Sequence, residues 1–357
     1  MNELFAIALS KIKGLGPKNA HLLLSKFSFE EIFSADFDPA LLCNQGQKAK
    51  KQALIEAEKE LKLCEEKGIQ VIHCQSLAYP FRLLQCADAP VVLYVLGNLD
   101  LNRSKHLSVV GTRRATHYGK GVLESFFEDW DHSGLSIISG MAHGIDGQAH
   151  KLALKHGLPT LAVLGHGLKT RYPAAHRKLA NEIVEHGGAL LTEFTYNTLG
   201  LPEFFPMRNR IVAGLSDATL VVEASNKGGA LITADLAHGY GREVFAVPGN
   251  IQQKYSLGCN RLIVNQKAQA LISGKGLLQN MGWDKGMNAP AAQMQMALAL
   301  SEDQEAVYAL LNKPQGKHRD ELLMELNWPV GKLMMVMLEM ELQGYLRILP
   351  GNFCVKL

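Results

Sequence analysis

The sequence has little net charge and no paired pattern of cysteines, and both absences narrow the range of functions. With 37 Lys and Arg residues against 34 Asp and Glu residues, the formal net charge is only +3. A general polycation is therefore excluded, and affinity for a polyanion would have to come from local patches. The six cysteines include no Cys-x-x-Cys spacing. We expect free thiols in a reducing cytoplasm rather than disulfides or zinc ligands.

Signals for secretion and membrane insertion are also missing. Residues 1–3 carry no basic stretch of the kind that opens a signal peptide. No apolar run is long enough to cross a bilayer. We therefore expect a soluble, cytoplasmic protein without membrane contact. A chain of 357 residues with 47% hydrophobic content can form one large core and smaller modules.

The sequence does contain a series of short apolar runs, each ending near glycine or another small residue. Segments of helical length and period separate them, which is the pattern of a parallel sheet covered on both faces. Parallel strands end at one edge, here called the crest, and the turns beyond them form the default ligand site. The runs are 107–110, 136–139, 160–164, 189–193, 218–223 and 243–247.

Three turns at the crest carry basic residues. The first combines a glycine with two arginines, the second holds two arginines before a short helix expected at 211–215, and the third is a Lys-Gly-Gly turn that opens a helix. Guanidinium groups match phosphate oxygens, and helix N-terminal amides attract anions. The recurrence favours a phosphate-binding edge over ordinary solvated turns. The turns are 111–114, 205–210 and 224–230.

The crest lacks the residue patterns of most enzymes. Its first turn is not Gly-x-Gly-x-x-Gly, so we expect no nicotinamide cofactor. No Ser-His-Asp or Cys-His constellation is evident, and helix capping is the simplest task for Asp146. We predict no catalytic residues, no metal ligands and no cofactor.

Long collinear motifs between about residue 79 and residue 272 resemble those of the DNA-processing protein A family (DprA, also called Smf). The motifs are 109–113, 139–146, 164–168 with Tyr172 and Pro173, 205–216, 227–234 and 241–249. One departure is Ala174, because family members often have a basic residue after the Tyr-Pro pair. Residues 176–178, His-Arg-Lys, stand close to that position.

The resemblance implies an extended Rossmann-like domain that binds single-stranded DNA and forms a homodimer. It further implies that the protein protects incoming DNA and loads the recombinase RecA onto it in natural transformation. Arg113, Arg208, Arg210 and Lys227 would hold consecutive phosphates with little sequence preference. The predicted nucleic-acid-binding residues are Gly111, Thr112, Arg113, Arg114, Ser139, Gly140, Met141, His143, Tyr172, Phe205, Arg208, Asn209, Arg210, Lys227, Gly228 and Gly229.

Two other functions stay open. The turn at 227–233 also resembles the Pro-Gly-Gly-x-Gly-Thr loop of Rossmann-fold nucleotide phosphoribohydrolases, which predicts a nucleotide-hydrolysing enzyme as the alternative. Against this, the second loop glycine is absent, and bulky Leu231 and Ile232 stand where the loop should continue. The third possibility is a scaffold whose sheet domain only dimerises, with the apolar segment near 251–271 as the family-derived contact.

The chain divides into three predicted modules and a linker. Residues 1–66 resemble a helix-hairpin-helix or SAM-like helical domain, whose Gly-x-Gly turn at 14–16 could hold a DNA phosphate or serve packing alone. Residues 67–283 form the extended Rossmann-like DNA-binding domain, with 69–72 and 91–97 as additional strands. Residues 284–300 are a linker.

Residues 301–357 read as a winged-helix-like domain. Helices are expected at 305–311, 318–326 and 330–343, followed by a hairpin across Pro350 and Gly351. Acidic residues outnumber basic ones here, and Lys332 is the only base on the candidate recognition helix. Because such a surface repels phosphates, we expect a protein-contact role for this module.

Overall fold

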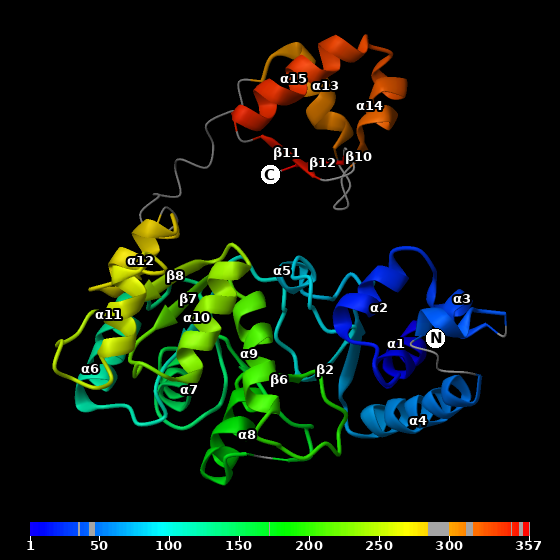
Figure 1. Ribbon diagram of the computed structural model, residues 1–357. Coiled ribbons are helices and arrows are strands. Elements are labelled where there is room, and N and C mark those ends of the chain that lie inside the picture. The colour runs from blue at the N-terminus through cyan, green and yellow to red at the C-terminus, as the bar shows by residue number, and fades with distance from the viewer. Residues whose placement is uncertain are drawn as a thin grey trace. The chain divides into compact units, whose positions relative to one another are not determined.

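The computed structural model describes the chain except for residues 35, 43–46, 171, 285–299, 312–316, 344, 350–352 and 357. The chain forms two compact units, Met1–Met287 and Asn288–Leu357 (Figure 1). The large unit contains the predicted sheet and the amino-terminal helices, and the small unit contains the carboxyl-terminal helices and hairpin.

The large unit is built on a nine-stranded sheet in the order β1-β2-β6-β5-β4-β3-β7-β8-β9. Neighbouring strands from β6 to β9 pair in parallel, whereas β2 pairs antiparallel with both β1 and β6. The predicted α/β fold with a mostly parallel sheet is confirmed, and the structure adds β9. The strands are β1 (Gln70–His73), β2 (Val92–Gly97), β3 (His106–Val110), β4 (Ser136–Ser139), β5 (Thr160–Val163), β6 (Ala189–Thr192), β7 (Ala218–Val221), β8 (Glu243–Ala246) and β9 (Gln269–Ala270).

Successive strand residues point to opposite sides of the sheet, so apolar side chains lie on both faces, and helices cover each face. Leu107 and Val109 of β3 join one core cluster, and Val110 joins the other. The first cluster is closed by α6 (His117–Asp129), α7 (Ile145–Lys155) and α12 (Gly274–Asn280). The second is closed by α8 (Arg177–Glu185), α9 (Phe204–Gly214), α10 (Gly229–Gly239) and α11 (Leu257–Val264).

The amino-terminal helices pack against the β1–β2 side of the sheet. Buried residues of α1, including Ile7 and Leu9, belong to the same core cluster as β1 and β2, and the Gly-x-Gly turn lies between α1 and α2 with Gly14 at φ +82°. Lys13 and Lys18 beside this turn are exposed. The packing role is therefore visible, and the phosphate role stays a prediction. The elements are α1 (Asn2–Ser10), α2 (Pro17–Leu24), α3 (Phe29–Phe33), a 3-10 turn at Pro39–Leu42 and α4 (Gln47–Glu66).

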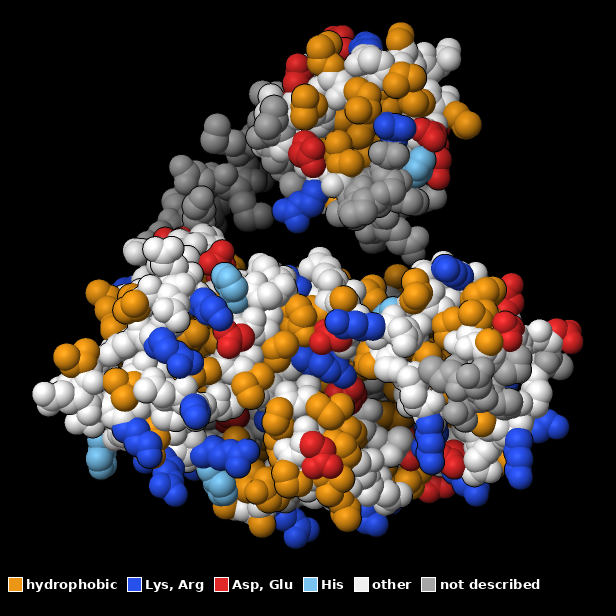
Figure 2. Space-filling view, viewed as in Figure 1, with side chains coloured by type: hydrophobic (Ala, Val, Ile, Leu, Met, Phe, Trp, Pro, Cys, Tyr) orange, Lys and Arg blue, Asp and Glu red, His pale blue; other side chains and the backbone are white. Residues whose placement is uncertain are grey.

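The small unit has the helices and hairpin expected from its sequence, and it also contains a short strand at Lys317–His318 that was not expected. Its three-stranded sheet has the order β10-β12-β11. Apolar side chains gather on its surface in Figure 2, and Val330, Met334, Met335 and Leu338 of α15 are exposed. The elements are α13 (Glu302–Leu310), β10 (Lys317–His318), α14 (Arg319–Leu326), α15 (Val330–Leu342), β11 (Leu346–Leu349) and β12 (Phe353–Lys356).

Cys64, Cys74, Cys86 and Cys259 are buried free thiols, and Cys354 is buried as well. Burial raises the pKa of the Cys64 and Cys259 thiols to about 12, which keeps them protonated and unreactive. Cys43 lies outside the described residues. Across the described ranges, no helix combines the length and apolar character needed to span a membrane.

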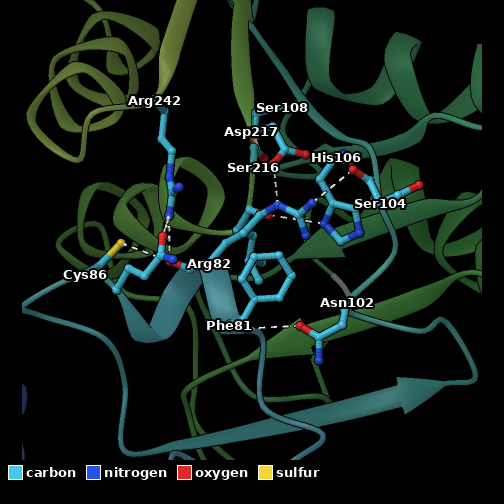
Figure 3. Close-up of polar contacts among 12 residues, drawn as sticks. Phe81, Arg82, Cys86, Asn102, Ser104, His106, Ser108, Ser216, Asp217 and Arg242 are labelled. Atoms are coloured by element: carbon cyan, nitrogen blue, oxygen red, sulfur yellow. Dashed lines mark hydrogen bonds and ion pairs between the residues drawn. The ribbon is translucent and has the colours of Figure 1, made fainter. Parts of the chain in front are cut away.

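The edge of the sheet opposite the crest is held by a buried ion pair (Figure 3). Arg82, from α5 (Phe81–Leu84), donates from Nε to Oδ1 of Asp217 over 2.5 Å and from Nη2 to the Ser104 carbonyl over 3.1 Å. The other oxygen of Asp217 accepts the backbone N–H of His106, which begins β3, over 2.8 Å. At this edge the cation is paired within the protein through Nε and Nη2.

Candidate functional site

A cavity of about 550 Å³ lies at the crest, over the carboxyl ends of β3, β4 and β7. Its walls come from the turns after these strands, from α9 and from the start of α10. The fold therefore brings together most of the residues predicted from the three basic turns. The predicted residues that line this crest cavity are Gly111, Thr112, Arg113, Arg114, Gly140, Phe205, Arg208, Asn209, Lys227, Gly228 and Gly229.

The turn after β3 is fixed by backbone contacts on both sides. The N–H of Thr112 donates to the Glu223 carbonyl over 2.7 Å, and the Thr112 carbonyl accepts the N–H of Ile145 over 3.2 Å. Gly144 has φ +80°, and a Cβ there would overlap the Thr112 carbonyl oxygen. Glycine is therefore required where the turns after β3 and β4 meet.

The Glu223 side chain beside this turn is engaged within the fold. Glu223 is buried, and its carboxylate accepts the Thr116 N–H over 2.9 Å and the Thr116 hydroxyl over 2.6 Å. These bonds tie the start of α6 to the end of β7. The negative charge is thus used inside the fold.

Four exposed cations surround the cavity: Arg113, Arg114, Lys227 and Lys254. Within the residues that the structure describes, none of the four forms an ion pair. The Arg113 guanidinium lies 5.9 Å from the centre of the Phe205 ring. An anion could reach these groups without first breaking a salt bridge. Our sequence reasoning missed Lys254, although it follows β8, whose end lies at the same crest.

Arg208 forms the floor of the cavity rather than its rim. Its side chain is buried, and Nη1 donates to the carbonyls of Gly140, over 2.5 Å, and of Val163. Burial lowers the pKa of Arg208 to about 10, and the nearby Asp146 carboxylate opposes that shift. Asp146 is itself buried, which raises its pKa, and its Oδ2 accepts the Ala142 N–H over 3.3 Å. Asp146 thus holds the turn after β4, where we had expected a cap of α7.

Arg210 does not reach the cavity, which corrects its expected place on the crest. We had expected a turn at 205–210 before a helix at 211–215, but α9 begins at Phe204. Two residues along a helix turn the side chain by about 200°, so Arg208 and Arg210 face opposite ways. Arg210 instead forms an ion pair with Glu193 and donates to the Asp88 carbonyl over 2.7 Å.

The remaining predicted residues lie beside the cavity. Ser139 is buried and donates to the Val109 carbonyl over 2.6 Å. Met141, His143 and Tyr172 line a small neighbouring hollow that shares Arg113 and Phe205 with the crest cavity. The Tyr172 and Phe205 rings are 5.3 Å apart, so two aromatic faces lie close to the basic turns.

The cavity offers little of what catalysis would need. Gly229 begins α10, so a helix starts where the phosphoribohydrolase loop would continue. Asp146 is the one carboxylate among the described lining residues, and it is engaged with the turn after β4. In the part of the chain that the structure describes, no group of three or more His, Cys, Asp or Glu residues could hold a metal ion.

A mostly parallel sheet with an open basic cavity at its crest defines a Rossmann-like protein. The family model described as DNA recombination-mediator protein A matches residues 70–282, and that of the DprA winged helix domain matches residues 289–352. The chain belongs to the DprA family. The winged-helix nature of the small unit is thereby confirmed.

Individual relatives and solved structures support the same family assignment. The chain is 37% identical over 302 residues to protein Smf of Escherichia coli (strain K12), covering 82% of this chain and 80% of that protein. It is 38% identical over 217 residues to DNA processing protein DprA of Bacillus subtilis (strain 168), covering 60% and 72%. The structure of DprA from Streptococcus pneumoniae matches with a TM-score of 0.65 and 30% identity, over 76% of this chain and 95% of that one.

A second solved relative bears on the ligand. The structure of DNA processing protein A from Helicobacter pylori, which describes a single-stranded DNA binding mode, matches with a TM-score of 0.55 and 26% identity. It covers 60% of this chain and 96% of that chain. The B. subtilis, S. pneumoniae and H. pylori relatives are named as DNA processing proteins, and the last of them binds single-stranded DNA.

Proposed function

We propose that this protein binds single-stranded DNA at the crest cavity without sequence preference, protects it and loads RecA onto it in natural transformation. The observation that carries the proposal is the set of four exposed cations around one cavity, each without an ionic partner among the described residues. A cation that is already buried and paired, as Arg82 is with Asp217, could not bind a phosphate in this way.

The ligand chemistry follows from the residue types. Arg113, Arg114, Lys227 and Lys254 would contact phosphates, and the free amides at the start of α10 would add hydrogen bonds. Asn209, the amide side chain in the cavity, donates to the Gly229 carbonyl over 3.2 Å. Since this amide is engaged, few side chains of the cavity can form hydrogen bonds with base edges, and sequence preference should be low.

Aromatic faces would take the bases. Phe205 and Tyr172 lie beside the phosphate-binding turns, and stacking on such side chains is worth about 1–3 kcal/mol per base. Bases are free to stack in this way only where they are unpaired. A single strand therefore suits the site better than a duplex does.

The partners are part of the same proposal. The H. pylori relative supports single-stranded DNA as the ligand, and the family resemblance supports RecA as the recipient of the strand, a homodimer and a cytoplasmic location. Ile251, Val264 and Ile272 are exposed in or beside the segment that we expect at the dimer contact. We propose a binding role without catalysis for the crest cavity.

A gel shift with oligo-dT, with and without RecA, tests the proposal. We expect wild type to bind, the Arg113→Ala/Lys227→Ala variant to bind at least about tenfold more weakly, and wild type alone to speed RecA binding to the strand. Lys155→Ala, an exposed lysine on α7 outside the cavity, is the matched control. Equal binding by wild type and the double variant would exclude the crest cavity as the DNA site.

A further inference from the structure

A second basic hollow lies on the other side of the turn after β3. It has a volume of about 570 Å³ and is formed by that turn, by the start of α6 and by the first turns of α7. Gly144 and Gly147 form part of its wall, so the α7 backbone lies open to the space. We call it the α7 hollow. Arg113, Arg114 and His143 of its lining are among the predicted nucleic-acid-binding residues, whereas Lys120, Lys151 and His176 are not.

The α7 hollow is lined by cations and histidines. Lys120 comes from α6 and Lys151 from α7, and both are exposed. Among its described lining residues there is no Asp or Glu. On the face shown in Figure 2, Lys and Arg side chains gather over α7 and α8, with His side chains among them. Such an excess of one charge attracts a polyanion and raises its local concentration.

Two histidines are held together at the rim of this hollow. The rings of His143 and His176 meet edge to face at 5.1 Å, and Nδ1 of His176 lies 2.9 Å from the Met141 carbonyl oxygen. His176 packs directly on Gly147, where a Cβ would lie 2.5 Å from the ring. Burial lowers the pKa of His176, and His143 and Lys151 lower it further.

The α7 hollow and the crest cavity are neighbours that share Arg113 and Arg114. These two side chains follow each other on one turn, whose backbone is fixed against Gly144. A chain of phosphates could therefore pass from one site to the other without leaving basic surface. A small phosphate compound would fill either site but would gain nothing from their continuity.

We propose that the α7 hollow is a second phosphate-binding site, which holds the backbone of the same single strand beyond the crest cavity. Lys120 and Lys151 supply its own charges, Arg113 and Arg114 are shared, and the His143 ring can add a hydrogen bond. This inference rests on the proposed function, because the strand must first occupy the crest cavity. It predicts a footprint that depends on strand length.

The test compares two lengths of oligo-dT with full-length protein. An oligonucleotide of about 4 nucleotides should be confined to one cavity, whereas one of about 16 nucleotides can extend across both. We expect the Lys120→Gln/Lys151→Gln variant to bind the long strand about tenfold more weakly than wild type, and the short strand equally well. The slope of log affinity against log salt for the long strand should fall by about 1.4, which corresponds to two lost phosphate contacts.

The matched control is Lys59→Gln/Lys155→Gln, which removes the same charge from exposed positions on α4 and α7 outside the hollow. It should bind both lengths as wild type does. All variants alter exposed side chains, and their thermal unfolding should match wild type.

The outcomes separate the two proposals. If the Lys120→Gln/Lys151→Gln variant binds the long strand with unchanged affinity and unchanged salt slope, the α7 hollow is not a phosphate site. If it weakens both lengths alike, or no more than the control variant does, the effect is one of general charge and the inference fails. If wild type binds neither length, the proposed function is overturned, and this inference with it.

Discussion

The guanidinium of Arg210 donates to the buried carboxylate of Glu193 on the side of α9 turned away from the crest cavity. The two side chains are only 11% and 14% exposed, so each charge depends on the other. Arg210→Ala would leave Glu193 buried without its partner. We expect the free energy of unfolding to fall by about 3 kcal/mol, while the folded variant keeps wild-type affinity for DNA. Denaturant unfolding and a gel shift measure the two quantities.

The result distinguishes a structural arginine from a binding one. A stable Arg210→Ala variant with strongly reduced DNA affinity would show that this guanidinium leaves Glu193 to contact the strand.

Salt dependence tests how many cations contact the strand. If Arg113, Arg114, Lys227 and Lys254 each neutralise one phosphate, log affinity for a short oligo-dT should fall against log salt with a slope of about 3. Arg113→Ala should lower that slope by about 0.7 and weaken dT, dC and dA strands alike. Fluorescence anisotropy over a salt series measures both effects. A flat salt response, or a loss confined to one base composition, would contradict the phosphate model.

The buried histidines predict a loss of stability in acid. Burial lowers the pKa of His106 to about 4 and that of His150 to about 3, so both stay neutral in the folded protein at pH values where the unfolded chain binds protons. Stability therefore rises with pH between about 4 and about 6.5, the ordinary histidine pKa. From about pH 7 to about pH 5 these two histidines should lower the free energy of unfolding by about 4 kcal/mol.

Urea unfolding at the two pH values measures this change. His150→Gln should remove about half of it, because one of the two buried imidazoles is gone, whereas His132→Gln, at an exposed position, should not. An acid sensitivity that survives in His150→Gln at full size would place its origin elsewhere.

Gly144 should tolerate no side chain. Its φ of +80° is unfavourable for other residues, and a Cβ would overlap the Thr112 carbonyl oxygen. Gly144→Ala must therefore displace the turn that carries Arg113 and Arg114, and we expect a loss of at least about 2 kcal/mol in stability together with weaker DNA binding. Gly187→Ala also has a positive φ but meets nothing within 4 Å, so it isolates the backbone cost. Equal effects in the two variants would show that the overlap does not matter.

Removal of residues 301–357 should leave the affinity for single-stranded DNA within about twofold of wild type. Lys332, the base on the candidate recognition helix α15, pairs with Asp303 over 2.7 Å and lies 4.3 Å from the Trp328 ring centre. Lys317 pairs with Glu325 over 2.5 Å. Because these cations are already neutralised, the unit has little to offer a phosphate. Oligo-dT binding by the truncated chain measures this, and a large loss would assign DNA contact to the winged helix.

The sheet and the crest could be predicted from the sequence because their signal is local. Each apolar run, such as 107–110, coincides with a strand to within a residue or so, and the glycine turns mark the strand ends. Parallel order then places Gly111, Gly140 and Lys227 at one edge without knowledge of any distance. The fold class alone was therefore enough to predict that these turns lie close together.

The roles of the arginines on α9 could not be predicted in this way. Whether Arg208 and Arg210 share a face depends on where the helix begins, and we had expected that start at 211, after a turn that contains Pro206, rather than at Phe204. Proline is tolerated in the first turn of a helix, so both starts were compatible with the sequence. The partner of Arg210, Glu193, lies 17 residues earlier, beyond the reach of a local pattern. Lys254 was missed because no glycine turn adjoins it directly.

The Arg82–Asp217 pair has a consequence for how a partner would first meet this protein. At the edge of the sheet where β3 begins, a cation is neutralised internally, while at the other edge four cations remain available to solvent. With a net charge of only +3, the molecule attracts a distant polyelectrolyte weakly. The four exposed cations nevertheless create a local positive potential at the crest. Diffusional encounters with a polyanion would therefore be pre-oriented toward one end of the strands, and low ionic strength would speed them.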